Sequence, residues 1–188
     1  MLCFPDGSLK FKRDNTMTVK SYLYNTILLL SISLISHTSW AKDWPTQQIL
    51  PLDLSIEAAK AAIKQCHDDG FKVSVAIVDH AGLLKVQLKA DGAGPHTLDS
   101  SRRKAYTSNS MRGPTQKYAV LAVNKPELQS LARMNEHILL LGGGFPIIKN
   151  GAVIGGVGVG GAPGIQYDEV CASAALKVLK ADETFENK

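Results

Sequence analysis

The amino-acid sequence predicts an α+β domain in which an antiparallel sheet is built from two hairpins with flanking helices. Two pairs of β-rich segments are each joined by a short turn, within residues 72–89 and 145–159. Helical periodicity precedes the first pair, separates the two pairs and follows the second. Because hairpin partners run antiparallel, a doubly wound parallel sheet is not expected.

The amino-terminal part of the chain differs in character from the rest. Residues 22–35 form an apolar run after Lys20, and the small residues Ser39 and Ala41 follow it. This order is typical of a secretory signal peptide, and the run is shorter than the roughly 20 residues of a membrane-spanning helix. We expect a periplasmic or secreted protein that is cleaved after Ala41 and then has no stable membrane anchor. A retained membrane anchor is the alternative.

Length and composition indicate one globular domain. The chain has 188 residues, 45% hydrophobic and 20% charged, with a net charge of +4 spread along its length. Nucleic acid is therefore not an expected partner. Residues 1–16 show no periodicity, so translation from Met17 is favoured over Met1 but not settled. The expected organisation is an N-terminal extension with signal peptide (1–41), a linker (42–53), the folded domain (54–180) and a polar tail (181–188).

Two cysteines, Cys66 and Cys171, remain after the expected cleavage. Both lie in segments with helical periodicity, in a chain expected to reach an oxidising compartment. Two cysteines are too few for a disulfide framework, and a free cysteine is often a small buried hydrophobe. The sequence therefore leaves open whether they are bridged.

The first helix and hairpin are indicated by local signals. Ser55 is a suitable N-cap, and apolar residues recur at helical spacing from Ile56 until residues 68–70 end the helix. Residues 72–78 and 83–89 are then β-rich around a short turn. We expect these segments to form a hairpin.

Two helical segments follow the hairpin. Residues 91–95 break the second strand, and a helix is expected from Thr97 or Asp99 to about Met111. A second, irregular helical region covers about residues 115–133, with an interruption at Pro126. On the first of these helices a face of small residues recurs at i, i+4 and i+7, which allows close packing; its members are Ser101, Ala105 and Ser108.

The second hairpin has the clearest turn. Asn150-Gly151 separates a strand at residues 145–148 from one at 152–159, and such a pair strongly favours a two-residue hairpin turn. A terminal helix is expected from about residue 168 to 179. Its inward-facing candidates are Val170, Ala174 and Leu176.

Glycines at 156, 158 and 161 match the spacing of a dinucleotide-binding fingerprint. The context argues against that function, because the glycines lie largely within a strand and too little chain follows for a βαβ unit. Close packing or a backbone-lined ligand wall explains them better.

The histidines left after cleavage lie at positions 67, 80, 96 and 137, and none is paired at a metal-binding spacing. His67 is interpreted as a solvated helix end and His80 as a turn residue. His96, at the mouth of a helix, lies where loops often carry function. No nucleophile, base or carboxylate pair is arranged for catalysis, which favours a binding protein over an enzyme.

Arg103 and Lys104 belong to the densest polar cluster of the sequence. One interpretation is an exposed helix face. The other is an anion site in which these cations hold a carboxylate such as a propionate.

Two long stretches, residues 89–115 and 142–176, resemble the signature regions of the GlcG/HbpS-type haem-binding family, and the resemblance extends from about residue 54 to 179. The matching motifs are Asp91-Gly92-Ala93, Lys104-Ala105-Tyr106-Thr107, Gly143-Gly144-Phe145-Pro146-Ile147, and Gly161-Ala162-Pro163-Gly164 followed by Asp168-Glu169.

The resemblance implies a profilin-like fold, homo-oligomers that are often octamers, and haem or a related tetrapyrrole as ligand. Family members include exported haem-binding proteins that work with sensor kinases, proteins encoded with glycolate utilisation, and domains of corrinoid adenosyltransferases. Haem degradation has also been attributed to the family. The ligand-binding residues expected here are His96, Arg103, Lys104, Thr107, Asp91, Gly143, Gly144 and Pro146.

The expected function is therefore that of an exported haem-binding protein for sensing, storage or protection. His96 is the first candidate for the iron ligand and His80 the reserve. One alternative is an accessory protein or enzyme that binds a small 2-hydroxy acid such as glycolate with the loops at residues 91–97 and 142–146. The other is a structural oligomer without a small ligand.

Overall fold

The structure is a computed structural model that describes residues 46–182. The expected signal peptide, its cleavage site and most of the polar tail lie outside the described residues. Among residues 46–182, no helix is long and apolar enough to cross a membrane. In chain order the elements are α2 (Leu52–Asp68), β1 (Ser74–Asp79), β2 (Leu84–Lys89), α3 (His96–Met111), α4 (Thr115–Asn124), the 3-10 helix η1 (Pro126–Arg133), β3 (Gly144–Lys149), β4 (Ala152–Gly160) and α5 (Ile165–Leu179).

The strands form one antiparallel sheet in the order β2-β1-β4-β3, which confirms the predicted α+β class. The two hairpins meet along β1 and β4, with Ser74 opposite Gly160 and Asp79 opposite Gly155. Asn150 and Gly151 both have positive φ angles, of 52° and 75°, as a two-residue hairpin turn requires. The local turn signals therefore predicted the strand pairs correctly.

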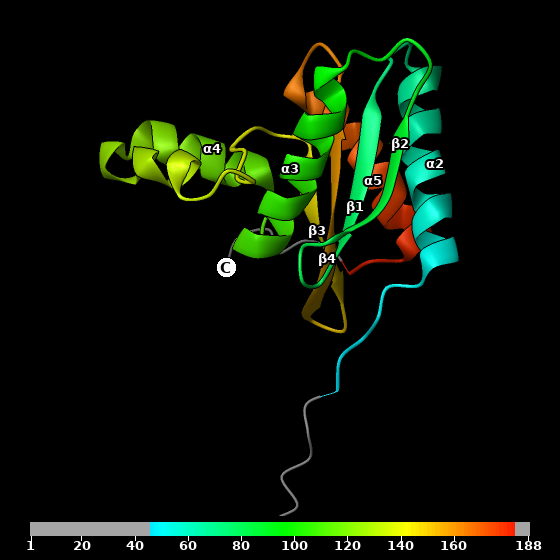
Figure 1. The fold of residues 1–188 in the computed structure, drawn as a ribbon, viewed down its shortest axis with the longest axis horizontal. Coiled ribbons are helices and arrows are strands. Elements are labelled where there is room, and N and C mark those ends of the chain that lie inside the picture. Colours follow the sequence, from blue (N-terminus) through cyan, green and yellow to red (C-terminus); the bar gives the residue numbers. More distant parts are fainter. Residues whose placement is uncertain (1–45, 183–188) are drawn as a thin grey trace, which may run out of the picture. The chain divides into compact units, whose positions relative to one another are not determined.

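Helices α2 and α5 pack on one face of the sheet, and α3 covers the other (Figure 1). The contact between α2 and α5 is made by small side chains, and Cys66 and Cys171 form a disulfide within it, with their Cα atoms 5.5 Å apart. This pairing is the one that the sequence left open. The fully buried alanines of the contact are Ala58, Ala59, Ala62, Ala172 and Ala175.

The small-residue face of α3 lies directly on the glycines of β4. A Cβ atom at Gly158 would lie 2.2 Å from the carbonyl oxygen of Ser101, and one at Gly156 would lie 2.3 Å from that of Ala105. No side chain fits at these distances, so the backbone of α3 is in direct contact with the backbone of β4. The glycines of β4 thus serve close packing.

The amino-terminal end of the domain differs from the prediction. Ser55 does not cap α2; it is buried in the first turn, and its hydroxyl donates to the carbonyl of Pro51 at 2.7 Å. Leu50 is also buried, so the fold begins inside the expected linker (42–53).

Helix α5 begins at Ile165, before the predicted start. Of its predicted inward-facing residues, Leu176 packs against the core, but Val170 does not. Val170, predicted to point inward, is 50% exposed, while its neighbours Cys171 and Ala172 are fully buried. The disulfide to Cys66 requires Cys171 to face α2, and that orientation turns Val170 outward.

Helices α4 and η1 form an arm, the α4–η1 arm (residues 115–133), which confirms the helical region with a break at Pro126. Figure 1 shows α4 pointing away from the sheet. Thr115, at the base, is the one buried residue in these two helices. The rest of the arm is half-buried or exposed.

Candidate functional site

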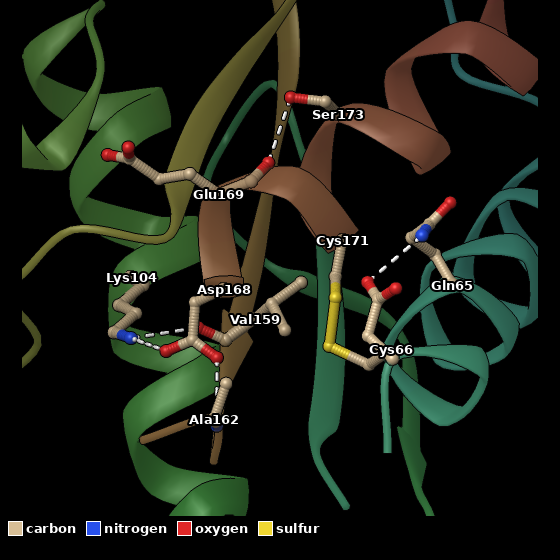
Figure 2. Close-up of a disulfide and its surroundings, with 10 residues drawn as sticks. Gln65, Cys66, Lys104, Val159, Ala162, Asp168, Glu169, Cys171 and Ser173 are labelled. Carbon is tan, nitrogen blue, oxygen red and sulfur yellow. Dashed lines mark hydrogen bonds and ion pairs between the residues drawn. A yellow bond between two sulfur atoms is a disulfide. The ribbon is translucent and has the colours of Figure 1, made fainter. Parts of the chain in front are cut away.

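Lys104 lies at the centre of a buried polar cluster at the carboxyl end of β4. Its side chain is 2% exposed, and its ammonium donates to Asp168 Oδ2 at 2.7 Å and to the carbonyl of Val159 at 2.9 Å. The other carboxylate oxygen of Asp168 accepts from the amide of Ala162 at 3.1 Å. Figure 2 shows this chain of contacts linking α3, the end of β4 and α5.

The cluster fits because glycine stands at neighbouring backbone positions. A Cβ atom at Gly143, whose φ is +106°, would lie 3.0 Å from the Lys104 ammonium and 2.8 Å from the carbonyl oxygen of Val159. Any larger residue there would displace the ammonium from its partners. A Cβ atom at Gly144 would lie 2.5 Å from the carbonyl oxygen of Lys104, so the structure brings together three residues of the predicted site: Lys104, Gly143 and Gly144.

The two carboxyl groups at the start of α5 are both affected by burial. Burial raises the pKa of Asp168 above its ordinary value, and the Lys104 ammonium and the Ala162 amide act in the opposite direction. Burial also raises the pKa of Glu169, against a smaller opposing effect of the Gly143 amide. Proton binding at this site is therefore linked to folding.

The expected role of Lys104 as a partner of a propionate does not fit this arrangement. The ammonium is buried and already holds a carboxylate and a carbonyl, so binding a propionate would break a buried ion pair. Sequence alone could not show this, because a lysine within a helix is usually exposed.

Arg103 and Thr107 also serve contacts within the fold. Arg103 Nη2 donates to the carbonyl of Ile138 at 2.6 Å, and the hydroxyl of Thr107 accepts from the amide of Leu139 at 2.8 Å. Both therefore hold the segment before β3 against α3. The Nε of Arg103 is buried without a partner among the described residues.

The remaining predicted residues lie in several places. His96 is exposed as the first residue of α3, and His80 is exposed in the turn between β1 and β2. Gly144 and Pro146 are buried in β3, where the amide of Gly144 donates to the hydroxyl of Thr115 at 3.0 Å. The predicted set is thus not one continuous site.

Asp91 lies at a cleft between α2 and β2, which we call the α2–β2 cleft. Its volume is about 780 Å³. One wall is a single face of α2, on which the lining residues recur at i, i+3, i+4 and i+7; the other is the end of the edge strand β2 and the loops beside it. The lining residues are Lys60, Ile63, Lys64, His67, Phe71, Lys72, Leu88, Lys89, Ala90 and Asp91.

The α2–β2 cleft combines an apolar floor with cationic edges. Ile63, Phe71 and Leu88 are half-buried and pack against the core of the domain. Four lysines lie among the lining residues, against one carboxylate, Asp91, and the Lys64 ammonium is paired with exposed Asp68. Such a surface suits an apolar ligand that carries negative charges.

His67 adds an imidazole to the lining of the α2–β2 cleft. Its side chain is 84% exposed, with Nδ1 3.8 Å from Asp68 Oδ1. The interpretation as a solvated helix end is correct about exposure, but it missed the cleft. The spacing of His67 from Lys60, Ile63 and Lys64 was the signal that could have placed them on one face.

Comparisons with known proteins agree on one family. The family model described as haem-degrading protein HbpS-like matches residues 50–177. A protein of Citrobacter freundii, described as an uncharacterized 15.0 kDa protein in the dhaT-dhaS intergenic region, is 32% identical over 136 residues, which cover 70% of this chain and 94% of the relative.

Two solved structures have similar folds. A double mutant of Streptomyces reticuli HbpS is 39% identical, with a TM-score of 0.67 over 72% of this chain and 90% of that one. The complex of PduOC with heme is 22% identical, with a TM-score of 0.68 over 74% of this chain and all of that one (100%). At that identity the second similarity shows the fold alone.

Proposed function

Because the chain belongs to the HbpS-like family of haem-degrading proteins, we propose that it binds haem or a related tetrapyrrole in the α2–β2 cleft. The observation that carries this proposal is the lining of the cleft, where an apolar floor meets four lysines and a histidine. The PduOC:heme complex shows that a protein of this fold can hold haem, without indicating where this chain would hold it.

The residues of the α2–β2 cleft match the chemistry of haem. Haem presents an apolar ring to a protein and two propionates to the solvent edge, and its iron accepts a neutral imidazole. Ile63, Phe71 and Leu88 offer apolar contact to the ring, the lysines offset the charge of the propionates, and His67 is the candidate iron ligand on this wall.

Haemin titration, followed by the Soret band, tests the proposal. The wild type is expected to show a saturable shift at no more than one haem per chain, and His67→Ala is expected to abolish the sharp band. His96→Ala and His80→Ala are the matched variants, because both histidines are exposed outside the cleft lining. Loss of the band in either of these would instead support the sequence-based assignment. No saturable shift in the wild type would overturn haem binding.

The charge of the α2–β2 cleft has its own test in the same titration. Lys60→Glu combined with Lys89→Glu places negative charge at the edges of the cleft and is expected to weaken haemin binding. Lys125→Glu combined with Lys177→Glu makes the same change of charge at two exposed residues outside the cleft lining, and should leave binding unchanged. Equal effects of the two changes would point to nonspecific attraction of an anion.

We also infer that the protein is exported, with haem sensing, storage or protection as its role outside the cytoplasm. The buried disulfide between Cys66 and Cys171 supports export, because such bonds persist in oxidising compartments. The expected mature chain begins at Lys42. Amino-terminal sequencing of the periplasmic or secreted protein would test this, and retention of residues 22–35 would contradict it.

A homo-oligomer is the further part of the proposal, with the α4–η1 arm as its contact surface. Val120 and Val123 are 47% and 77% exposed on the arm, and shallow hollows beside them are lined largely by apolar residues. Exposed apolar surface of this kind is usually covered by a partner, and closed symmetric pairing of identical arms would cover it with a second copy.

The small-acid alternative has less support from the site. Lys104, the buried cation next to the loop at residues 142–146, is already paired with Asp168. A titration with glycolate and lactate, monitored by thermal shift, distinguishes this alternative from haem binding and from a structural oligomer without ligand.

A further inference from the structure

The end of α2, which forms one wall of the α2–β2 cleft, is hydrogen-bonded to the backbone of Cys66, and Cys66 forms the disulfide with Cys171. The amide of Phe71 donates to the carbonyl of Cys66 at 2.7 Å, and the amide of Gly70 donates to that of His67 at 2.9 Å. These bonds end α2 and turn the chain toward β1, with Gly70 at a φ of +83°. The positions of His67 and Phe71 therefore depend on where this turn of α2 is held.

Helix α5 holds that turn at two points. The ring of Phe71 packs on the ring of Tyr167, with centroids 4.8 Å apart. One helical turn later Cys171 forms the disulfide with Cys66, and Figure 2 shows this bond joining α5 to α2. Tyr167 and Cys171 are four residues apart and thus lie on one side of α5. The covalent bond is the stronger of the two attachments.

We propose that the redox state of the Cys66–Cys171 disulfide controls the order of the cleft wall that carries His67 and Phe71. The effect on a ligand rests on the function proposed above. In the reaction an external dithiol attacks the disulfide and passes through a mixed disulfide, after which its second thiol closes its own disulfide. Two electrons and two protons are thereby transferred, and Cys66 and Cys171 become thiols.

The direction of the effect follows from what remains after reduction. The last turn of α2 is then held by the Phe71–Tyr167 contact and by small alanine side chains, which bury little apolar area each. Helix ends held in this way open locally at low free energy. A ligand that needs His67 and Phe71 in place must then order them on binding, so its affinity falls.

Burial of the Cys66–Cys171 disulfide makes its reduction slow and limits it to strong reductants. Both cysteines are fully buried, so a reductant reaches the sulfur atoms only when α2 and α5 part locally. The extent of reduction must therefore be measured by counting thiols in the folded protein. A strong dithiol is the required class of reductant.

Hydrogen exchange with mass spectrometry tests the structural half of the proposal without any ligand. The full chain is compared in its oxidised form, after reduction with dithiothreitol and thiol counting, and as the Cys66→Ala/Cys171→Ala double variant. Amides in the 66–72 segment are expected to exchange at least about tenfold faster without the disulfide. Peptides from α3, on the other face of the sheet, serve as the internal control and should not change. Equal exchange at 66–72 in all three forms, or a uniform rise that includes α3, would overturn the proposal.

Haemin titration of the same three forms tests the ligand half. The dissociation constant is expected to rise about tenfold or more in the reduced form and in the double variant. Faster exchange at residues 66–72 with an unchanged dissociation constant would overturn the link to the ligand. Failure of the oxidised wild type to bind haemin would instead overturn the proposed function, while the exchange experiment would still decide whether the disulfide controls the wall.

Discussion

Lys104 on α3 and Asp168 on α5 meet at the carboxyl end of β4 in an ion pair of 2.7 Å in which both side chains are almost completely buried. The pair joins helices from opposite faces of the sheet. The Lys104 ammonium also donates to the carbonyl of Val159, and the Asp168 carboxylate also accepts from the amide of Ala162. A buried pair of this kind costs desolvation energy when it forms, but the loss of one partner leaves an uncompensated charge. Removing either member alone should therefore be more harmful than removing both.

Asp168→Ala is expected to lower the free energy of unfolding by about 3–5 kcal/mol, because the Lys104 ammonium stays buried with one carbonyl as its partner. The double variant Lys104→Met/Asp168→Ala should lose less than the sum of the losses in Lys104→Met and Asp168→Ala. Urea denaturation followed by circular dichroism measures each value. Lys64→Met, which removes the exposed pair with Asp68, is the control and should leave the midpoint unchanged. Strict additivity of the two buried changes would contradict a coupled pair.

The raised pKa of Glu169 predicts how stability depends on pH. A carboxyl group whose pKa is higher in the folded chain binds its proton more tightly there, so its stabilising contribution is complete below its ordinary pKa of 4.5. That contribution is lost as the pH rises through the raised value in the folded chain. Glu169→Gln removes this titration, so the wild type should lose stability relative to this variant as the pH rises from 4.5. If the free energy of unfolding changed with pH in the same way in both proteins, the linkage would be contradicted. Glu57→Gln, at an exposed position, is the matched control.

Gly158→Ala is expected to destabilise the fold by about 1–3 kcal/mol or more. The new Cβ atom would lie 2.2 Å from the carbonyl oxygen of Ser101 and 2.4 Å from the amide nitrogen of Ala105, and backbone atoms of a helix cannot move aside as a side chain can. Gly164→Ala is the control, since its Cβ atom would meet the flexible Gln166 side chain instead. Thermal unfolding of the two variants gives the comparison, and equal losses would contradict backbone contact between α3 and β4.

Val123→Glu is expected to lower the mass of the assembled protein in solution without changing the unfolding of the chain. Val123 is 77% exposed on the α4–η1 arm, where the proposed contact with a second copy would bury it. Light scattering at micromolar concentrations measures the mass. Leu83→Glu, at a 66% exposed residue in the turn between β1 and β2, provides the control. A wild type that is already monomeric would remove the basis for this contact surface.

The sequence predicted the order and pairing of the elements because their signals are local. Asn150-Gly151 specifies its turn from two residues, and the small face of α3 is visible as a spacing within one helix. These features needed no knowledge of distant parts of the chain, and the structure confirms them.

The site depends on distant partners, which local patterns do not contain. Lys104 looks like a surface cation until Asp168, 64 residues later, is placed beside it. His67 looks like a free helix end until the edge strand β2 lies along the same face of α2. The pairing of Cys66 with Cys171 was equally undecided, since geometry and not cysteine count determines a disulfide.

The same disulfide has a consequence for the chain after proteolysis. Cys66 and Cys171 are 105 residues apart, and the covalent loop between them contains the whole sheet, α3 and the α4–η1 arm. A protease that cuts one turn in this loop, such as the turn at Asn150-Gly151, leaves two fragments that are still bonded to each other. The fragments cannot diffuse apart, and each remains at a high effective concentration for the other. A nicked molecule thus keeps every strand of its sheet in one covalent unit.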